Sequence, residues 1–169
     1  MTEVGLRPAT SGDSEFCFAL HRDAMGRYVE QIWGWDDALQ RAHHERTFDP
    51  ARTQIITVDG HDAGSISVER RPTETYLGRI EIHPGYQGQG IGSRLIQSLL
   101  DEAARRGHPV TLDVQAVNQQ AHALYRRLGF HDVARHGQNN IKTRMSSARP
   151  REESSSVAAR RPDRNRSRG

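Results

Sequence analysis

The chain has 169 residues, which is enough for one domain with a sizeable core and too few for two ordinary domains. Its net charge of +3 is uneven: residues 149–169 hold seven arginines and three acidic residues, so the first 148 residues carry a net charge of −1. The single cysteine excludes an internal disulfide and indicates a reducing compartment. No secretory signal and no membrane-spanning apolar run is visible, so we expect a cytoplasmic protein without a membrane partner.

The first half of the chain predicts a strand, two helices and an antiparallel meander. A short strand over residues 4–7 precedes a helix that extends to about Arg27. The aromatic segment 28–35 contains a glycine and is expected to separate this helix from a second one, which begins near Asp36. Three β-branched segments then predict strands over residues 53–58, 63–69 and 75–83.

The second half changes to a helical period. Ile91, Leu95, Leu99 and Ala103 recur every four residues and give one broad apolar helix face. A strand over residues 110–115, a helix over 118–128 and a hairpin over 130–134 and 140–145 are expected to follow. Residues 1–146 are therefore predicted to form a single domain, and the arginine- and serine-rich segment 147–169 is predicted to be a disordered tail.

This order of elements predicts the fold class. An N-terminal antiparallel meander followed by strand–helix–strand units is typical of an α/β protein. We expect a mixed, mostly antiparallel central sheet with helices on both faces.

One glycine-rich loop between a strand and a helix is the most informative motif. Gly88, Gly90 and Gly92 stand at alternate positions, where the absence of Cβ atoms lets a ligand approach the backbone closely. The free amides and the positive end of the dipole at a helix N-terminus favour a phosphate group. The alternative interpretation is an ordinary tight turn between strand and helix.

Two common phosphate-binding motifs do not fit this loop. A Walker A loop ends in Gly-Lys-Ser/Thr, whereas this chain has Gly92-Ser93-Arg94. A dinucleotide fingerprint that starts at Gly88 requires a third glycine where Ser93 stands. The pattern that remains is Gln-x-x-Gly-x-Gly over residues 87–92.

A second motif follows after one further strand and has the form Asn-x-x-Ala-x-x-Leu-Tyr-x-x-x-Gly-Phe. It runs Asn118-Gln119-Gln120-Ala121-His122-Ala123-Leu124-Tyr125-Arg126-Arg127-Leu128-Gly129-Phe130. Together, the two motifs make residues 77–130 resemble the GNAT superfamily of acyl-CoA N-acyltransferases. The N-terminal third resembles the family only in the order of its elements, and the tail is not covered.

The resemblance implies acetyl-CoA as co-substrate, no metal, and a pair of splayed strands that holds the pantetheine arm. In the family, the coenzyme lies where the strand that ends near residue 83 diverges from the strand over 110–115. The implied binding residues are Ile82, His83, Gln87, Gly88, Gln89, Gly90, Ile91, Gly92, Ser93 and Asn118.

The implied reaction is direct transfer of an acetyl group to a primary amine in a ternary complex. A base must first neutralise the amine, and Glu81 is the first candidate because it alternates with the apolar Ile80 and Ile82. Asp113 is the second candidate, and either carboxylate could instead be a hydrogen-bonded residue without a catalytic role. Tyr125 resembles the family's general acid, with a core tyrosine as the alternative.

The acceptor site in this family is usually formed by the N-terminal helices and their loop. This implies Tyr28, Trp33, Trp35 and Asp37, since aromatic faces and carboxylates both favour a cationic amine. The alternative is that the tryptophans anchor the helices in the core. The acceptor is a small-molecule or peptide amine, and a homodimer is left open.

Two other functions remain as alternatives. One is a non-catalytic acyl-CoA-binding or regulatory domain, and the other is an acetyltransferase that acts on an RNA-linked amine. The tail has no aromatic residues between its arginines, so nucleic acid is not expected as a partner.

Overall fold

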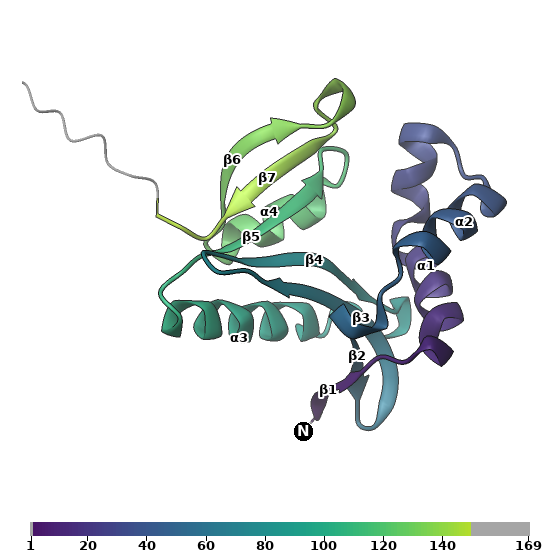
Figure 1. Cartoon of the computed structure of the whole chain (residues 1–169), viewed down its shortest axis with the longest axis horizontal. Helices are drawn as coiled ribbons and strands as arrows, with labels where there is room; N and C mark the ends of the chain where they lie inside the picture. The colour runs from purple at the N-terminus through teal and green to yellow at the C-terminus, as the bar shows by residue number, and fades with distance from the viewer. Residues whose placement is uncertain (1, 150–169) are drawn as a thin grey trace, which may run out of the picture.

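A computed structural model of the chain describes residues 2–149 (Figure 1). The predicted tail lies outside these residues from position 150 onward. Its first residue, Ser147, still belongs to the fold, because its amide donates to the Val110 carbonyl at 2.9 Å. Within the described part of the chain, no helix has both the length and the hydropathy needed to cross a bilayer.

The described residues form one seven-stranded sheet and four helices. The strands are β1 (Val4–Pro8), β2 (Thr53–Val58), β3 (His61–Arg70), β4 (Thr75–Ile82), β5 (Val110–Gln115), β6 (His131–His136) and β7 (Lys142–Ser146). The helices are α1 (Ser14–Trp33), α2 (Asp37–Thr47), α3 (Ile91–Arg105) and α4 (Gln119–Arg127). Four short 3₁₀ turns are η1 (Ser11–Asp13), η2 (Pro50–Arg52), η3 (Pro84–Tyr86) and η4 (Gln138–Asn140).

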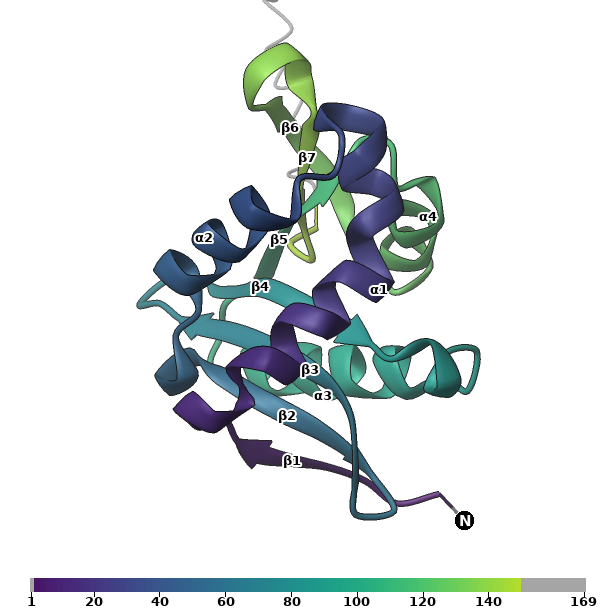
Figure 2. The ribbon, with the colours of Figure 1, turned by 90° about the vertical axis from the view of Figure 1, so that its right-hand side faces the viewer.

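The sheet order is β1-β2-β3-β4-β5-β7-β6, and every neighbouring pair is antiparallel except β4 and β5. The expectation of a mixed, mostly antiparallel sheet is therefore confirmed. Helices α1 and α2 lie on the opposite side of the sheet from α3 (Figures 1 and 2).

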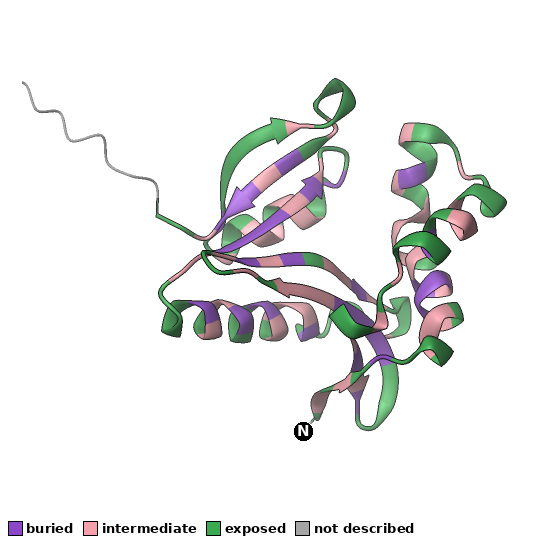
Figure 3. Cartoon of the chain, in the orientation of Figure 1, coloured by how far each residue is buried: buried purple, intermediate pink, exposed green. Residues whose placement is uncertain are grey.

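The main core lies between the sheet and α3, with α4 packed against its edge. Buried side chains of β2 to β5 meet the apolar face of α3. Figure 3 colours the buried residues of these elements purple. The predicted apolar positions Ile91, Leu99 and Ala103 are all buried there. A smaller cluster around Cys17 and Ile55 holds α1 against the other face of the sheet.

The expected break between the first two helices is in the wrong place. α1 continues through Gly26 and Tyr28 as far as Trp33, and it ends at Gly34, where φ is +74°. A glycine inside a helix costs only about 1 kcal/mol relative to alanine, and the burial of Val29 in the next turn outweighs that cost. The second helix begins as expected, with the Asp36 carboxylate accepting from the Leu39 amide.

Strands β4 and β5 separate soon after they begin. Their parallel pairing covers only three positions and ends at Leu77 opposite Leu112. At the same place the register of β4 against β3 shifts by one residue, because Gly78 has no partner on β3. A bulge of this kind bends its strand, so β4 turns away from β5 and the two strands form an open wedge. The predicted pair of splayed strands is confirmed.

Candidate active site

A cavity of about 260 Å³ occupies the wedge between β4 and β5. Its walls come from β4, β5, β7, α1 and α4. It is lined by His21, Met25, Tyr76, Leu77, Gly78, Arg79, Ile80, Glu81, Leu112, Asp113, Val114, Gln115, Asn118, Ala121, Tyr125 and Lys142. All three predicted catalytic residues, Glu81, Asp113 and Tyr125, therefore meet at one cavity.

The glycine-rich loop connects the wedge to the start of α3. Gly88 and Gly90 have φ values of +77° and +76°, a conformation that L side chains rarely adopt. Gly92 has neither a positive φ nor a close neighbour, since an added Cβ would meet nothing within 4 Å. The fold therefore gives no internal reason for glycine at this position, whereas a ligand that approaches the backbone does.

The start of α3 leaves amides available for an anion. The Arg94 amide donates to the Gly90 carbonyl at 3.1 Å, so the amides of residues 91–93 precede the helical hydrogen bonds. They point out of the helix together with the positive end of its dipole. Gln89 and Gln87 are exposed beside them.

The end of β4 presents backbone groups to the wedge. The His83 amide donates to the Ala63 carbonyl of β3, and the groups of Ile82 therefore point to the opposite side, where β5 has diverged. There the Ile82 carbonyl accepts from the Gln87 side chain at 2.8 Å. The His83 ring is directed to its own turn, because Nδ1 accepts from the Gly85 amide.

Glu81 is a buried carboxylate with only one of its two oxygens occupied. Its Oε1 lies 2.8 Å from Nδ1 of His21 and 3.2 Å from Nε of Arg79. Its Oε2 is buried without a hydrogen-bond partner. As predicted from the alternation, the side chain lies on the α1 face, while Ile80 and Ile82 pack against the main core.

Asp113 has both oxygens occupied. Arg144 donates to them at 2.7 and 2.9 Å, His136 Nε2 lies 2.6 Å from Oδ1, and the Tyr76 hydroxyl donates to Oδ2 at 2.8 Å. Burial alone would raise the pKa of Asp113, but these hydrogen bonds outweigh it and lower the pKa to about 2. A carboxylate held in this way is a poor proton acceptor, so the geometry favours Glu81 as the base.

Tyr125 reaches the cavity from α4. Its ring packs against Phe130 with the ring centroids 5.8 Å apart, and burial raises the pKa of its hydroxyl to about 12. Asn118 caps the same helix, since its Oδ1 accepts from the Ala121 amide at 3.1 Å. The amide nitrogen of Asn118 is not needed for this cap, and the residue also lines the cavity.

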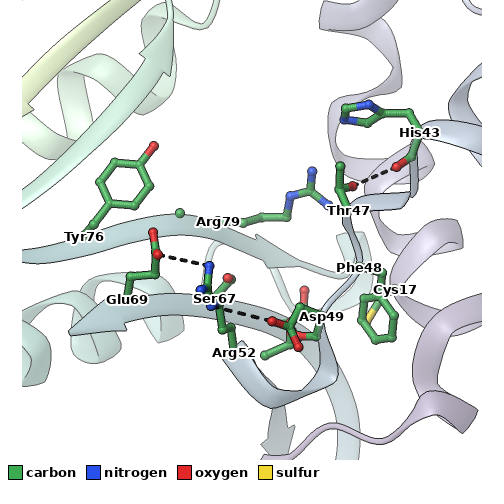
Figure 4. Close-up of a pocket in the computed structure, with 13 residues that line it drawn as sticks. Cys17, His43, Thr47, Phe48, Asp49, Arg52, Ser67, Glu69, Tyr76 and Arg79 are labelled. Atoms are coloured by element: carbon green, nitrogen blue, oxygen red, sulfur yellow. Dashed lines mark hydrogen bonds and ion pairs between the residues drawn. The ribbon is translucent and has the colours of Figure 1, made fainter. Parts of the chain in front are cut away.

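A second cavity, of about 250 Å³, lies beside the first and beneath α2 (Figure 4). The two cavities share Tyr76, Gly78 and Arg79 of β4 as lining residues. Figure 4 shows the Arg79 side chain extending from β4 toward α2. Most of the other lining groups are polar: His43, Thr47, Asp49, Arg52, Thr53, Ser65, Ser67 and Glu69. Cys17 also lines it, and burial raises the pKa of this thiol to about 11, which disfavours the reactive thiolate.

The four residues expected at the acceptor site line neither cavity. Trp33 is 59% exposed at the end of α1, and Asp37 pairs with Arg41. Tyr28 accepts a hydrogen bond from Arg27, whereas the half-buried Trp35 packs near Phe18, with the ring centroids 6.4 Å apart. The end of α1 and the β6–β7 loop lie on the same side of the molecule, across the open face of the sheet (Figures 1 and 2).

Among the polar residues that line the cavity, the sequence analysis missed His21, Tyr76, Arg79, Gln115 and Lys142. His21 lies 60 residues before Glu81, and only the packing of α1 over β4 brings the two together. Tyr76 and Arg79 stood in the predicted strand. The alternation of a strand that selected Glu81 also places Arg79, two residues earlier, on the same face. The sequence therefore contained a signal for Arg79 that our prediction did not use.

The sequence that forms this arrangement matches the model of a known protein family. The model of the acetyltransferase (GNAT) family matches residues 16–130, which include the wedge, the glycine-rich loop and both helices that follow. The chain belongs to the GNAT acetyltransferase family. The predicted resemblance is thereby confirmed.

Several curated GNAT acetyltransferases are similar in sequence. A mycothiol acetyltransferase of Clavibacter sepedonicus is 35% identical over 135 residues, which cover 78% of this chain and 44% of the relative. The [ribosomal protein bS18]-alanine N-acetyltransferase of Escherichia coli K12 is 43% identical over 104 residues, which cover 56% of this chain and 70% of the relative. The chain therefore spans less than half the length of the mycothiol acetyltransferases that it matches.

Solved GNAT structures share the fold. The PaiA N-acetyltransferase of Thermoplasma acidophilum in complex with coenzyme A has a TM-score of 0.69 at 15% identity, over 85% of this chain and 98% of that one. The ribosomal-protein-S18-alanine N-acetyltransferase of Escherichia coli has a TM-score of 0.58 at 22% identity, over 85% of this chain and 91% of that one.

Proposed function

We propose that this protein transfers an acetyl group from acetyl-CoA directly to the primary amine of an acceptor. One observation supports this most. Among the side chains of residues 2–149, only two buried polar atoms lack a hydrogen-bond partner, Glu81 Oε2 and Gln115 Oε1, and both residues line the wedge cavity. Both atoms accept hydrogen bonds, so the cavity suits a ligand rich in N–H groups, which an amine or an amide supplies.

The residues of the loop and the wedge fit the coenzyme. The amides of residues 91–93 would bind its pyrophosphate, and Gly88, Gly90 and Gly92 leave the space for it. The backbone of Ile82 would bind the pantetheine arm, with Asn118 on the opposite wall. When bound, acetyl-CoA supplies an acetyl group activated as a thioester.

Glu81 would prepare the acceptor for attack. With a lysine-like pKa of about 10.4, only about one amine in 10³ is neutral at pH 7. The free Oε2 of Glu81 accepts the proton that the amine must lose, while Oε1 stays bound to His21 and Arg79. A carboxylate on the cavity wall also attracts the cationic form of the amine before the reaction.

Tyr125 would supply the proton that the leaving sulfur needs. With the pKa of Tyr125 at about 12 and that of a thiol at about 8.5, the transfer is uphill by about 5 kcal/mol. An unperturbed tyrosine would require only about 2 kcal/mol. Tyr125 therefore donates late, once the negative charge on sulfur has developed.

The acceptor is a primary amine whose remaining part extends from Glu81 along β4 into the second cavity. The two cavities are adjacent, since both are lined by Tyr76, Gly78 and Arg79, and the hydroxyl and charged groups beneath α2 suit a polar chain. The name of the Escherichia coli relative gives it a ribosomal protein as acceptor. This favours a polypeptide amine for the present chain over a small-molecule amine.

A turnover assay tests the proposal. The purified protein is mixed with acetyl-CoA and either short peptides with a free N-terminus or small polyamines, and released thiol is measured. Thiol release that depends on the amine supports an acetyltransferase, and faster turnover of the peptides supports a polypeptide acceptor. Binding of acetyl-CoA with no turnover of any amine would instead indicate a non-catalytic binding domain.

Substitution of Gly92 tests the coenzyme site separately. In a helical turn with open space around it, Gly92→Ala is expected to stabilise the fold by about 0.5 kcal/mol. The bulkier Gly92→Leu is expected to fold equally well and to weaken coenzyme A binding at least tenfold, measured by calorimetry. Equal affinity of Gly92→Leu and the unchanged protein would contradict the proposed position of the pyrophosphate.

A further inference from the structure

We propose that His21 is a positioning residue for the acetyl transfer. His21 and Arg79 together hold one oxygen of Glu81, so that the other oxygen stays directed to the acceptor's amine. This inference rests on the proposed function, because it assigns His21 a role through the proposed base.

Both neighbours of Glu81 bind the same oxygen. His21 Nδ1 lies 2.8 Å from Oε1, and Arg79 Nε lies 3.2 Å from the same atom. The hydrogen bond with His21 and the ion pair with Arg79 together restrain the rotation of the carboxylate group. The second oxygen, Oε2, is buried and has no partner.

The partners of Glu81 differ from those of a carboxylate in an ordinary structural ion pair. Asp113, on the other wall of the same cavity, uses both oxygens for Arg144 and one oxygen each for His136 and Tyr76. A buried carboxylate is stable only when it is paired and hydrogen-bonded, so the second oxygen of Glu81 calls for a donor from a ligand or a water in the cavity. The arrangement around Glu81 is therefore incomplete by one hydrogen-bond donor, which an amine provides.

His21 has the more sheltered position of the two donors. Its side chain is 17% exposed, against 38% for Arg79, and its bond to Glu81 is shorter. An ionised carboxylate only accepts hydrogen bonds, so Nδ1 of His21 must carry the proton in this contact. The contact also links α1 to β4, and a change at His21 frees the carboxylate to rotate without removing it.

The experiment compares variants at His21 in the turnover assay with the intact chain. His21→Ala removes the donor, and His21→Asn retains an N–H donor near the place of Nδ1. His21→Gln moves the donor outward by one carbon. Gln31→Ala, an exposed change on the same helix, serves as the control for effects on α1 as a whole.

We expect His21→Ala to lower kcat roughly 10²-fold, since a displacement of about 1 Å in a catalytic group has an effect of this size. The KM for acetyl-CoA should change less than twofold. His21→Asn should recover most of the rate, His21→Gln should recover little, and Gln31→Ala should match the unchanged protein.

A double-mutant cycle separates positioning from folding. If His21 acts through Glu81, the variant with both His21→Ala and Glu81→Gln is no slower than Glu81→Gln alone. Losses that multiply would overturn the inference, and so would a fully active His21→Ala. Both results differ from failure of the proposed function, in which the unchanged protein itself releases no thiol with any amine. That outcome would overturn the proposed function and this inference together.

Discussion

The two walls of the wedge carry carboxylates with opposite surroundings. On β5, Asp113 is held by donors from β4, β6 and β7, and these hydrogen bonds lower its pKa to about 2. On β4, Glu81 is more deeply buried and yet has one oxygen without a partner. The carboxylate on β5 therefore joins neighbouring strands, whereas the carboxylate on β4 keeps one oxygen atom without a hydrogen-bond partner from the protein.

This difference shows that two carboxylates of one cavity can have different roles, one in stabilising the fold and one in the proposed reaction. Two acidic residues on neighbouring strands look equivalent in a sequence, and the number of donors around each decides its role. A fully paired carboxylate stabilises the fold and resists protonation. A half-paired one keeps a lone pair that, in the proposed reaction, accepts the proton of the amine.

The largest expected effect is that of Glu81→Gln. Loss of a general base lowers rates by about 10²–10⁴-fold, so we expect kcat to fall by about 10³-fold in the thiol-release assay. Coenzyme A binding should stay within twofold, because the proposed pyrophosphate site lies at the start of α3. A small loss of kcat would move the role of base from Glu81 to another group.

Tyr125→Phe is expected to have the next largest effect. Without the hydroxyl, the sulfur must leave as a thiolate or take its proton from water, and we expect kcat to fall by about 10²-fold. The phenyl ring keeps the contact with Phe130, so the melting temperature should change little. If Tyr125→Phe kept full activity, the tyrosine would be a packing residue, as the alternative interpretation holds.

In contrast to Glu81→Gln and Tyr125→Phe, Asp113→Asn should affect stability more than activity. The pKa of Asp113 falls from 3.8 to about 2 on folding, which corresponds to about 2 kcal/mol of stabilisation near neutral pH. Because the pKa is lowered, this contribution is complete above pH 4 and is lost as the pH falls from about 4 toward 2.

Urea unfolding at pH 7 and at pH 3 tests this prediction. The variant should be less stable by about 2 kcal/mol at pH 7, and the difference should shrink at pH 3. Its kcat should stay within about threefold of that of the unchanged protein. A loss of kcat as large as that of Glu81→Gln would show that the two walls do not differ in the proposed way.

The smallest expected effect concerns Trp33, outside both cavities. Since Trp33 stands exposed at the end of α1, Trp33→Ala should leave the KM for a small amine within twofold. A polypeptide that crosses the open face of the sheet would reach it, so the KM for a peptide acceptor should rise more. Equal effects on both acceptors would indicate a change in α1 itself.

The sequence by itself predicted the elements whose signals are local. These signals are the apolar residues at every fourth position of α3, the β-branched residues of β2 and β5, and the Asn118 cap. Each signal lies within one short segment of the chain, and the structure contains each of these elements. The glycine spacing in residues 88–92 also predicted a phosphate site, and this stays a prediction. The end of α1 was misplaced, because the burial of Val29 outweighs the weak helix propensity of Gly26.

Only the tertiary structure decided which groups face one another. The packing of α1 over β4 brings His21 to Glu81, and the bulge at Gly78 opens the wedge that holds their cavity. The pairing of β5 with β7 places Arg144 beside Asp113 and makes that carboxylate a weaker candidate for the base than Glu81. Periodicity reports which face of its own element a residue occupies, and partners 31 to 60 residues away are set by how those elements pack.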